Sequence, residues 1–401
     1  MNDIINPQRL LTDLYEQGKI GWVNGRGLTR KAYSETYMAA RKWLKDKMNR
    51  AGLCTRIDCV GNLLGRLEGE TEKTILIGSH LDSVENGGIY DGPLGIIAGL
   101  EIARGLKDHN IALNHSLEII AFIGEEGEPL GGTFGSRTFA GLLPSDYRKD
   151  QLEALGITRN DIIVSKCVPS NYIAFLELHI EQGPVLERKG VAIGVPSGIV
   201  GIMRFDVTVD GEANHAGTTP MQERKDALKS AVGLISKWFE WVDTQDKLVC
   251  NIGRLSITPG HVSIVPQRVT FTIEIRSVDD NVMTQAYDYI LRLAYDIVPC
   301  TASVKRIDGK PPVLLNDTLI GTICQCAERR SLSHIVMPSG ASHDSSPLAH
   351  VMPTAMIFVP SHNGISHSID EFTEEKDIVN GTQLLCDTVL ALDKLKKEDL
   401  E

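Results

Sequence analysis

The sequence predicts an α/β protein whose mixed sheet is covered by helices on both sides and is interrupted by a smaller inserted α+β domain. Three observations predict this class. Runs that are apolar on both strand faces alternate with helical segments in the first half of the chain. Residues 198–312 instead alternate polar and apolar positions with period two. The alternation of apolar strands with helical segments resumes after Lys310-Pro311-Pro312, so one domain consists of two chain segments.

Local signals predict the elements of the first segment in order. Asn6 and Pro7 are a typical helix start, and the chain reads as helical up to residue 50, with a second helix over 31–51. A hairpin is expected in 54–69. The elements that follow are strands at 74–77, 116–123 and 173–178, helices at 94–106 and 135–141, and a polar insert at 145–170.

The inserted segment predicts the order β-α-β-β-α-β of a ferredoxin-like unit. Its strands are expected at 203–210, 248–257, 268–277 and 302–307, and its helices at 224–242 and 280–297. A helix at 318–329, a strand at 354–359 and a long helix at 374–397 complete the first domain. The predicted domains are therefore a catalytic domain of 1–197 and 313–401, and an inserted lid or dimerisation domain of 198–312.

The amino-acid composition and net charge limit the classes of function that the protein can have. The 401 residues are 42% hydrophobic and 23% charged, which is typical of a soluble globular protein with a sizeable core. A formal net charge of −11 argues against a nucleic-acid partner. Neither a signal-peptide core nor a membrane-length apolar run is found, so no membrane partner is expected. Eight scattered cysteines favour free thiols in a reducing cytoplasm.

Acidic and imidazole side chains follow the predicted strands at the points where those strands end. His80 and Asp82 follow the first strand, and Asp91 lies nine residues further in a glycine-rich turn. Glu125 and Glu126 directly follow the second strand. Each group alone has an ordinary explanation, a hydrogen-bonded loop histidine or a solvated acidic turn. At the carboxyl ends of strands in an open α/β sheet, however, such side chains face the crevice in which ligands bind.

Two more strands repeat the pattern. His179 and Glu181 end the third strand, and His362 and His367 follow the fourth. Four coincident strand ends are hard to produce by chance, and imidazole with carboxylate but no thiolate suits Zn²⁺ or Mn²⁺. Two metals sharing a carboxylate polarise a carbonyl and lower the pKa of a bound water, and a spare glutamate can then act as general base.

Six motifs in order carry a family resemblance. They are GSHLDSVENGGIYDGPLG, GEEGEPLGGTFGSR, ELHIEQGPVLE, GEANHAGTTPM, MPSGASHD and HNGISHS, and they span about 60 to 370. Together they resemble the amidase/hydantoinase-carbamoylase branch of the binuclear metallo-aminoacylase and carboxypeptidase clan. Its members include N-carbamoyl-L-amino-acid hydrolases and allantoate amidohydrolases. The resemblance implies a two-domain, homodimeric hydrolase with two divalent ions per subunit, Zn²⁺ or Mn²⁺, with Co²⁺ and Ni²⁺ as alternatives.

The resemblance also implies roles for individual residues. Asp82 would orient His80 by accepting its other ring proton, and Glu125 would be the base that takes a proton from the attacking water and returns it to the leaving nitrogen. The metal ligands would be His80 and His179 on one ion, Glu126 and His367 on the other, and Asp91 bridging both.

The substrate side is implied to include residues of the inserted domain. His215 would polarise the scissile carbonyl, and Arg276 would clamp a substrate carboxylate, which suits a guanidinium group. Gln182 would contact the ureido or carboxylate end. Without the surrounding motifs, the favoured interpretation would be that Arg276 is an exposed cation on a strand and His215 a histidine in a turn.

The sequence departs from the family pattern at two places among the carboxylate-recognition elements and at one position next to the Asp91-Gly92 turn. Ser263 stands where the family usually has asparagine, with Gln267 in place of a glycine. Ser342 replaces a glycine beside His343 in SGASHD. Pro93 stands where alanine is more usual. The metal ligands match, so these departures bear on the identity of the substrate.

The leading hypothesis is hydrolysis of a linear C–N bond in a ureido acid, such as an N-carbamoyl-L-amino acid or allantoate, with release of ammonia and CO₂. The alternative is an aminoacylase or exopeptidase acting on N-acyl amino acids or dipeptides, since those reactions need the same metals and base. A non-catalytic protein on this fold is disfavoured, because such a protein would be expected to have lost Glu125 or a metal ligand.

Overall fold

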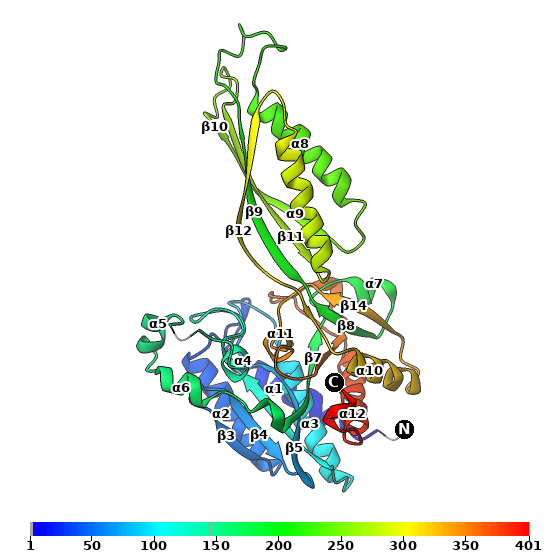
Figure 1. The fold of residues 1–401 in the computed structure, drawn as a ribbon. Helices are drawn as coiled ribbons and strands as arrows, with labels where there is room; N and C mark the ends of the chain where they lie inside the picture. Colours follow the sequence, from blue (N-terminus) through cyan, green and yellow to red (C-terminus); the bar gives the residue numbers. More distant parts are fainter. Residues whose placement is uncertain (1–2, 145, 401) are drawn as a thin grey trace. The chain divides into compact units, whose positions relative to one another are not determined.

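The structure, a computed structural model, describes residues 3–144 and 146–400 and divides into two compact units (Figure 1). Unit 1 consists of Met1–Ser197 and Leu314–Glu401, and unit 2 of Gly198–Val313. The chain therefore leaves the first unit, builds the second, and returns to complete the first.

Unit 1 is built on a mixed sheet, which has nine strands in the described part of the chain. Four neighbouring strands run parallel in the order β15, β7, β5, β6. They are β15 (Thr354–Val359), β7 (Tyr172–Ile180), β5 (Thr71–His80) and β6 (His115–Phe122). Because parallel strands end at the same sheet edge, the residues that follow these four strands lie together.

Antiparallel strands flank this parallel core. β4 (Leu63–Leu67) pairs with β6, and β3 (Cys54–Ile57) pairs with β4. On the other side β8 (Ile193–Ile199) runs antiparallel to β15. Next to β8 lie the remaining strands of the sheet, β14 (His334–Ser339) and β13 (Val313–Leu314).

Helices cover both faces of the sheet. Ile77 and Ile119 face α3 (Pro93–Asp108), where Gly99 lies directly against them. Leu76 and Ile120 are adjacent to Ile77 and Ile119 in the sequence, so their side chains point to the opposite face of the sheet. There they pack with Phe139 and Leu348. The other helices of unit 1 are α1 (Pro7–Gly18), α2 (Glu35–Arg50), α4 (Phe134–Phe139), α5 (Lys149–Ala154), α6 (Arg159–Val164), α7 (Val185–Lys189), α10 (Asp317–Arg329), α11 (Ser345–Leu348) and α12 (Glu375–Leu392), with short 3₁₀ turns at Pro169–Asn171, His362–Gly364 and Lys397–Asp399.

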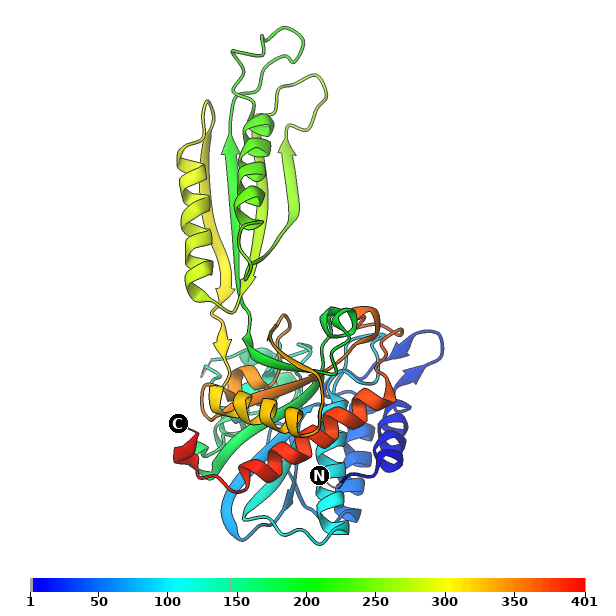
Figure 2. The same ribbon diagram turned by 90° about the vertical axis from the view of Figure 1, so that its right-hand side faces the viewer.

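Unit 2 has the element order that the sequence predicts. Its strands are β9 (Gly201–Asp210), β10 (Val249–Thr258), β11 (Arg268–Ser277) and β12 (Thr301–Lys310), and its helices are α8 (Ala227–Val242) and α9 (Asp280–Tyr295). The four strands are antiparallel in the order β10-β11-β9-β12. Both helices lie on one face (Figure 2), where fully buried Trp238 meets Phe205 edge-on. The other face carries charged pairs such as Arg204 with Glu274.

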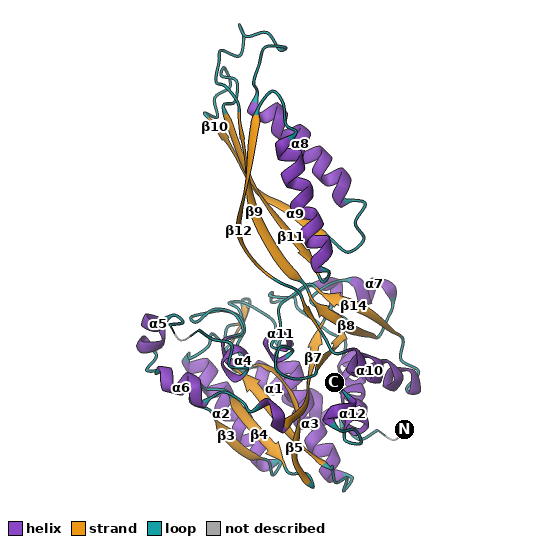
Figure 3. Ribbon diagram, in the orientation of Figure 1, coloured by secondary structure: helices purple, strands orange, loops and turns teal. Residues whose placement is uncertain are grey.

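The predicted fold class is confirmed, and the differences from it are local (Figure 3). A small hairpin of β1 (Trp22–Val23) and β2 (Gly27–Leu28) interrupts the expected N-terminal helices. The second helix begins only at Glu35, because the Ser34 side chain caps it by accepting from the Tyr37 amide. The polar insert contains α5 and α6, and β8 and β14 are strands that the sequence pattern did not predict.

Two further observations concern the helices and the cysteines. Over the described residues, every helix is too short or too polar to cross a membrane. All eight cysteines are free thiols.

Candidate metal centre

The carboxyl ends of β5, β6, β7 and β15, with the loops that follow them, bring the predicted metal ligands together at one sheet edge. His80 is the last residue of β5, and His179 lies at the penultimate position of β7. Both imidazoles are nearly fully buried. Asp91 reaches them from the turn that leads into α3, whose first residue is Pro93. Gly92 makes this approach feasible, because a Cβ there would lie 2.5 Å from the His80 ring, and its φ of 85° also favours glycine.

The two oxygens of the Asp91 carboxylate face different ligand groups. Oδ1 lies 3.4 Å from His80 Nε2 and 3.2 Å from His179 Nε2. Oδ2 lies 3.1 Å from His367 Nε2, and His367 Nε2 in turn lies 3.6 Å from Glu126 Oε2. His80, Asp91 and His179 thus form one group that can hold a metal ion, and Asp91, Glu126 and His367 form another. A carboxylate shared by two such groups has the arrangement of a bridging ligand.

The ring protons of the two buried histidines are fixed by backbone oxygens. His80 Nδ1 lies 3.0 Å from the Asp82 oxygen, and His179 Nδ1 lies 2.9 Å from the Ile180 oxygen. Since a carbonyl oxygen only accepts, Nδ1 of each ring carries a proton, and Nε2 is the ring nitrogen left to face Asp91 or a metal ion. His179 Nε2 is buried and makes no well-aligned hydrogen bond within the described residues, although it lies 3.2 Å from Asp91 Oδ1. A buried ring nitrogen that faces a carboxylate in this way fits a metal ligand.

Asp82 contacts the His80 ring, as the resemblance implied, but through its backbone oxygen. Its carboxylate does something else. Oδ1 accepts from the amides of Gly124 (2.9 Å) and Glu125 (3.3 Å), and Oδ2 accepts from the amide of Glu126 (3.1 Å). One buried carboxylate therefore fixes the turn that carries both predicted glutamates.

The charges around the centre favour a bound cation. Burial, together with the charges of Asp344 and Glu126, raises the pKa of Glu125 well above its ordinary value. Burial and Asp91 raise the pKa of Glu126 to about 7. Burial alone would raise the pKa of Asp91, but its contacts with His179, His367 and His80 hold that pKa well below the ordinary value. A cation bound near Glu125 and Glu126 would offset the burial and the like charges that raise the pKa values of these two carboxyl groups.

A third group, Glu177, His179 and His343, lies behind the first. Glu177 is fully buried and accepts from the Ser79 hydroxyl (2.8 Å) and from the amide and hydroxyl of Ser345 (2.9 and 2.7 Å). His343, also buried, lies edge-on to His179 with ring centroids 4.5 Å apart. Because neutral donors already satisfy both Glu177 oxygens, this group supports the His179 ring rather than offering a further ion site.

Gln182 follows β7 and contacts both Asp91 and His367. Its Nε2 donates to Asp91 Oδ2 at 2.7 Å, while its Oε1 is buried without a partner in the described chain. Its backbone is held in the left-handed region at φ 56°, with its amide donating to Ser361 Oγ. Ser342 lies between β14 and α11, in the same turn as His343.

The other predicted substrate residues belong to unit 2. His215 is exposed and accepts at Nδ1 from the Gly217 amide (3.0 Å). The Ala216 amide donates to the Ser263 oxygen (2.9 Å), so the two loops pair, and the Ser263 hydroxyl lies 2.8 Å from His261 Nδ1. Arg276, near the end of β11, donates from Nε to Glu274 at 2.9 Å.

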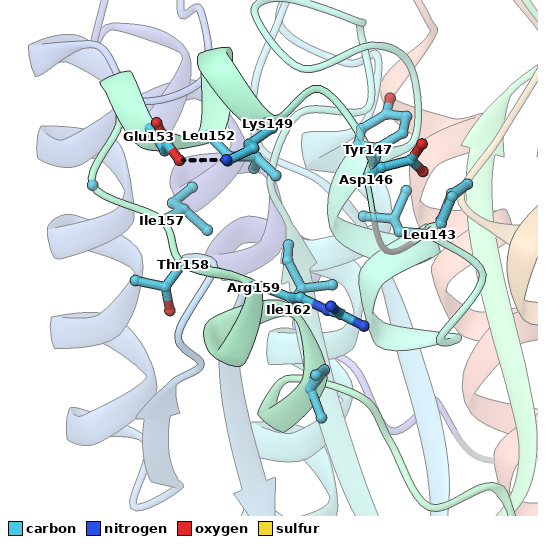
Figure 4. A pocket seen from close by; sticks show the side chains of 13 residues that line it. Leu143, Asp146, Tyr147, Lys149, Leu152, Glu153, Ile157, Thr158, Arg159 and Ile162 are labelled. Atoms are coloured by element: carbon cyan, nitrogen blue, oxygen red, sulfur yellow. Dashed lines mark ion pairs between the residues drawn. The ribbon is translucent and has the colours of Figure 1, made fainter.

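Two cavities bear on ligand access in unit 1. One of about 230 Å³ is lined by residues that include Asp82, Glu126 and Lys31, so it opens beside the metal-ligand groups. A larger one of about 760 Å³ lies in the polar insert, between Leu143 and Ile163 (Figure 4). None of the predicted site residues lines the larger cavity, so size alone would have pointed away from the metal-ligand groups.

Most of the chain, including the segments that carry these residues, matches a known protein family. The peptidase family M20/M25/M40 matches residues 76–391. That span contains every predicted site residue.

The chain belongs to this family.

Relatives within the family extend over almost the whole chain. An N-carbamoyl-L-amino acid amidohydrolase of Geobacillus stearothermophilus is 33% identical and covers 97% of this chain and 99% of its own. An allantoate amidohydrolase of Escherichia coli is 38% identical over 90% of this chain and 91% of its own. A solved hydantoinase/carbamoylase family amidase of Burkholderia multivorans superposes with a TM-score of 0.85 at 32% identity, covering 97% and 98% of the two chains. The expected relationship to hydantoinase/carbamoylase amidases is confirmed.

Some residues of the centre carried no recognised signal in the sequence. Glu177 and Asp344 are fully buried acids, and Glu371 is a buried acid beside the Asp91 turn. Glu177 lies two residues before His179, on the same side of β7, which was a usable signal. Glu371 follows His367 by four residues in a loop, where no periodicity indicates burial.

We predict that Asp82→Asn destabilises the metal-free protein. An asparagine retains one acceptor oxygen but turns an NH₂ group toward an amide of the 124–126 turn, so the free energy of unfolding should fall by about 1–3 kcal/mol. Urea denaturation followed by circular dichroism measures this. Glu85→Gln is the control, since the Glu85 side chain is 65% exposed and should change stability by about 0.5 kcal/mol or less. Equal stabilities of the two variants would contradict the role of the Asp82 carboxylate.

Proposed function

We propose that the chain is a hydrolase of a linear C–N bond in a ureido acid, working with two divalent metal ions bound at Asp91. The single observation that supports it most is the Asp91 carboxylate, whose two oxygens face two separate ligand groups. The ureido class of substrate is supported by the relatives, which are named as N-carbamoyl-L-amino acid and allantoate amidohydrolases. The predicted enzyme class, a hydrolase of C–N bonds other than peptide bonds, is confirmed by the same relatives.

The residues at the sheet edge fit two ions. His80 and His179 would bind one ion through Nε2, Glu126 and His367 would bind the other, and Asp91 would bridge them. The donor set is imidazole and carboxylate without thiolate, which suits Zn²⁺ or Mn²⁺, with Co²⁺ and Ni²⁺ as alternatives. When bound, such a pair of ions polarises the scissile carbonyl and makes water a stronger acid.

Glu125 is then the residue that moves the proton. Its backbone amide is held by Asp82, so its carboxylate is aimed from a fixed turn. It would take a proton from the attacking water and return it to the leaving nitrogen, which is the task of a general base followed by a general acid. Glu128, the third glutamate of the run, is exposed and pairs with Lys31, so it is not suited to this role.

Substrate binding is proposed for residues of both units. His215 would polarise the carbonyl and Arg276 would clamp a substrate carboxylate. The orphaned Gln182 Oε1 fits an N–H donor of the substrate. Ser263 in unit 2, and Ser342 with the adjacent His343 in unit 1, are proposed as further substrate-binding residues, and both serines are positions at which this chain departs from the family pattern. The buried contact of His343 with His179 suggests that this histidine acts mainly as a support.

We also propose a homodimer formed through unit 2, acting in the cytoplasm. The exposed edges of the unit 2 sheet, β10 and β12, are ten-residue strands that can pair with another copy. Leu255 and Ile257 on β10 and Ile307 on β12 are exposed apolar side chains, as expected of an interface. Eight free thiols are consistent with a reducing compartment.

The test of function is product analysis with the metal-loaded enzyme. The ureido panel contains allantoate, N-carbamoyl-L-amino acids, N-carbamoyl-β-alanine and ureidoglycolate, each assayed for ammonia. N-acetyl amino acids and dipeptides are assayed for free amine. We expect ammonia from a ureido acid and its loss after chelation. Free amine from the acyl or peptide set alone would assign the aminoacylase or exopeptidase activity instead, and undiminished activity after thorough chelation would contradict metal dependence.

We predict that Glu125→Gln lowers the turnover number about 10²- to 10⁴-fold, because the proton acceptor is lost while the turn is kept. Metal content, measured by elemental analysis, should be unchanged, since Glu125 is not a proposed ligand. Glu128→Gln is a matched control from the same run and should keep a near-normal rate. A near-normal rate for Glu125→Gln would refute its role as base.

A further inference from the structure

Glu371 is a buried acid that the proposed chemistry does not use. It lies in the loop between His367 and α12 and is only 6% exposed. Burying a carboxylate is costly unless hydrogen bonds compensate it. Its partners show what the burial achieves.

One oxygen of Glu371 binds the turn that carries the shared carboxylate. Oε1 accepts from the amides of Tyr90 (3.0 Å) and Asp91 (3.1 Å). Gly88 opens the space for this approach, because a Cβ on Gly88 would lie 2.2 Å from Glu371 Oε1 and 2.4 Å from Cδ. The turn therefore lies directly against the Glu371 side chain.

The other oxygen binds the loop that carries His367. Oε2 accepts from the Ser366 hydroxyl at 2.9 Å, and that hydroxyl also lies 3.1 Å from Asp91 Oδ2. A serine has one proton to donate. When a cation binds Asp91 Oδ2, the Ser366 proton is best given to Glu371, which keeps the two loops joined.

The two ligand groups differ in how they are supported. His80 and His179 lie on buried strands, and their ring protons are held by backbone oxygens. His367 lies on a loop, its side chain is 50% exposed, and its φ is 54°. The second group therefore depends on contacts that align His367 with Asp91, and Glu371 with Ser366 joins their two loops.

We propose that Glu371 is a positioning residue that aligns Asp91 with His367 and so determines how tightly the second metal ion binds. This inference rests on the proposed function, because it needs two ions at Asp91. Both Glu371 oxygens accept hydrogen bonds from the protein, so Glu371 is not itself a proposed ligand. It acts through the backbone of Asp91 and through Ser366.

The test is Zn²⁺ binding to metal-free protein, measured by equilibrium dialysis with elemental analysis. The wild type should bind two ions per chain. Glu371→Gln should bind the first ion within about threefold of wild type and the second about 10- to 100-fold more weakly, the range typical of groups that orient ligands. Ser366→Ala removes the hydroxyl that contacts Glu371, Asp91 and Gln182 and leaves the Glu371 carboxylate in place. It should weaken the second ion in the same direction and remains informative if Glu371→Gln fails to fold.

Glu187→Gln is the matched control. Glu187 also accepts from a backbone amide and a side chain of this loop, those of Asn363 and His362, but it does not touch Asp91. The Glu187→Gln variant should bind both ions as tightly as the wild type does.

The outcomes distinguish a failure of the Glu371 proposal from a failure of the two-ion function. Unchanged binding of the second ion in both Glu371→Gln and Ser366→Ala would overturn the role of Glu371, as would equal weakening of both ions in the two variants. A wild type that binds fewer than two ions would overturn the two-ion function itself, and the inference with it. Because the readout is binding, it does not depend on having found the substrate.

Discussion

The contact of the Asp91 carboxylate with three imidazoles is the interaction on which the rest of the structure depends. Three imidazoles approach its two oxygens within 3.1–3.4 Å, from strands and loops far apart in the sequence. A buried carboxylate among basic rings is stable only when positive charge is close to it. The contacts that direct these rings, and the turn that brings Asp91 to them, are therefore under a common constraint.

The fold meets this constraint at two levels. Four parallel strands end at one edge, which gathers His80, His179, Glu126 and His367 without any local sequence signal between them. Buried carboxylates then fix the loops by accepting backbone amides. Asp82 holds the turn of Glu125 and Glu126, and Glu371 holds the turn of Asp91. Precision in such a centre comes from these supporting hydrogen bonds as much as from the ligands.

The parallel strands and the residues at their ends could be predicted from the sequence. The parallel strands were visible as doubly apolar runs, and the acids and histidines that follow them indicated a metal centre because they recur at four strand ends. The atoms that Asp82 uses were not predictable, since the backbone oxygen and carboxylate of one residue serve different partners. Glu371 was missed because its burial depends on Gly88, nearly three hundred residues earlier. Short strands such as β14 were missed because pairing with β8 outweighs a weak local pattern.

The most direct test of the account is the position of bound metal. Anomalous diffraction from crystals loaded with Mn²⁺ or Zn²⁺ locates each ion independently of activity and substrate. We expect two peaks about 3.5–4 Å apart, one on each side of the Asp91 carboxylate. The first should lie beside His80 and His179, and the second beside Glu126 and His367. A single peak, or a peak between Glu177 and His343 with none at Asp91, would contradict this expectation.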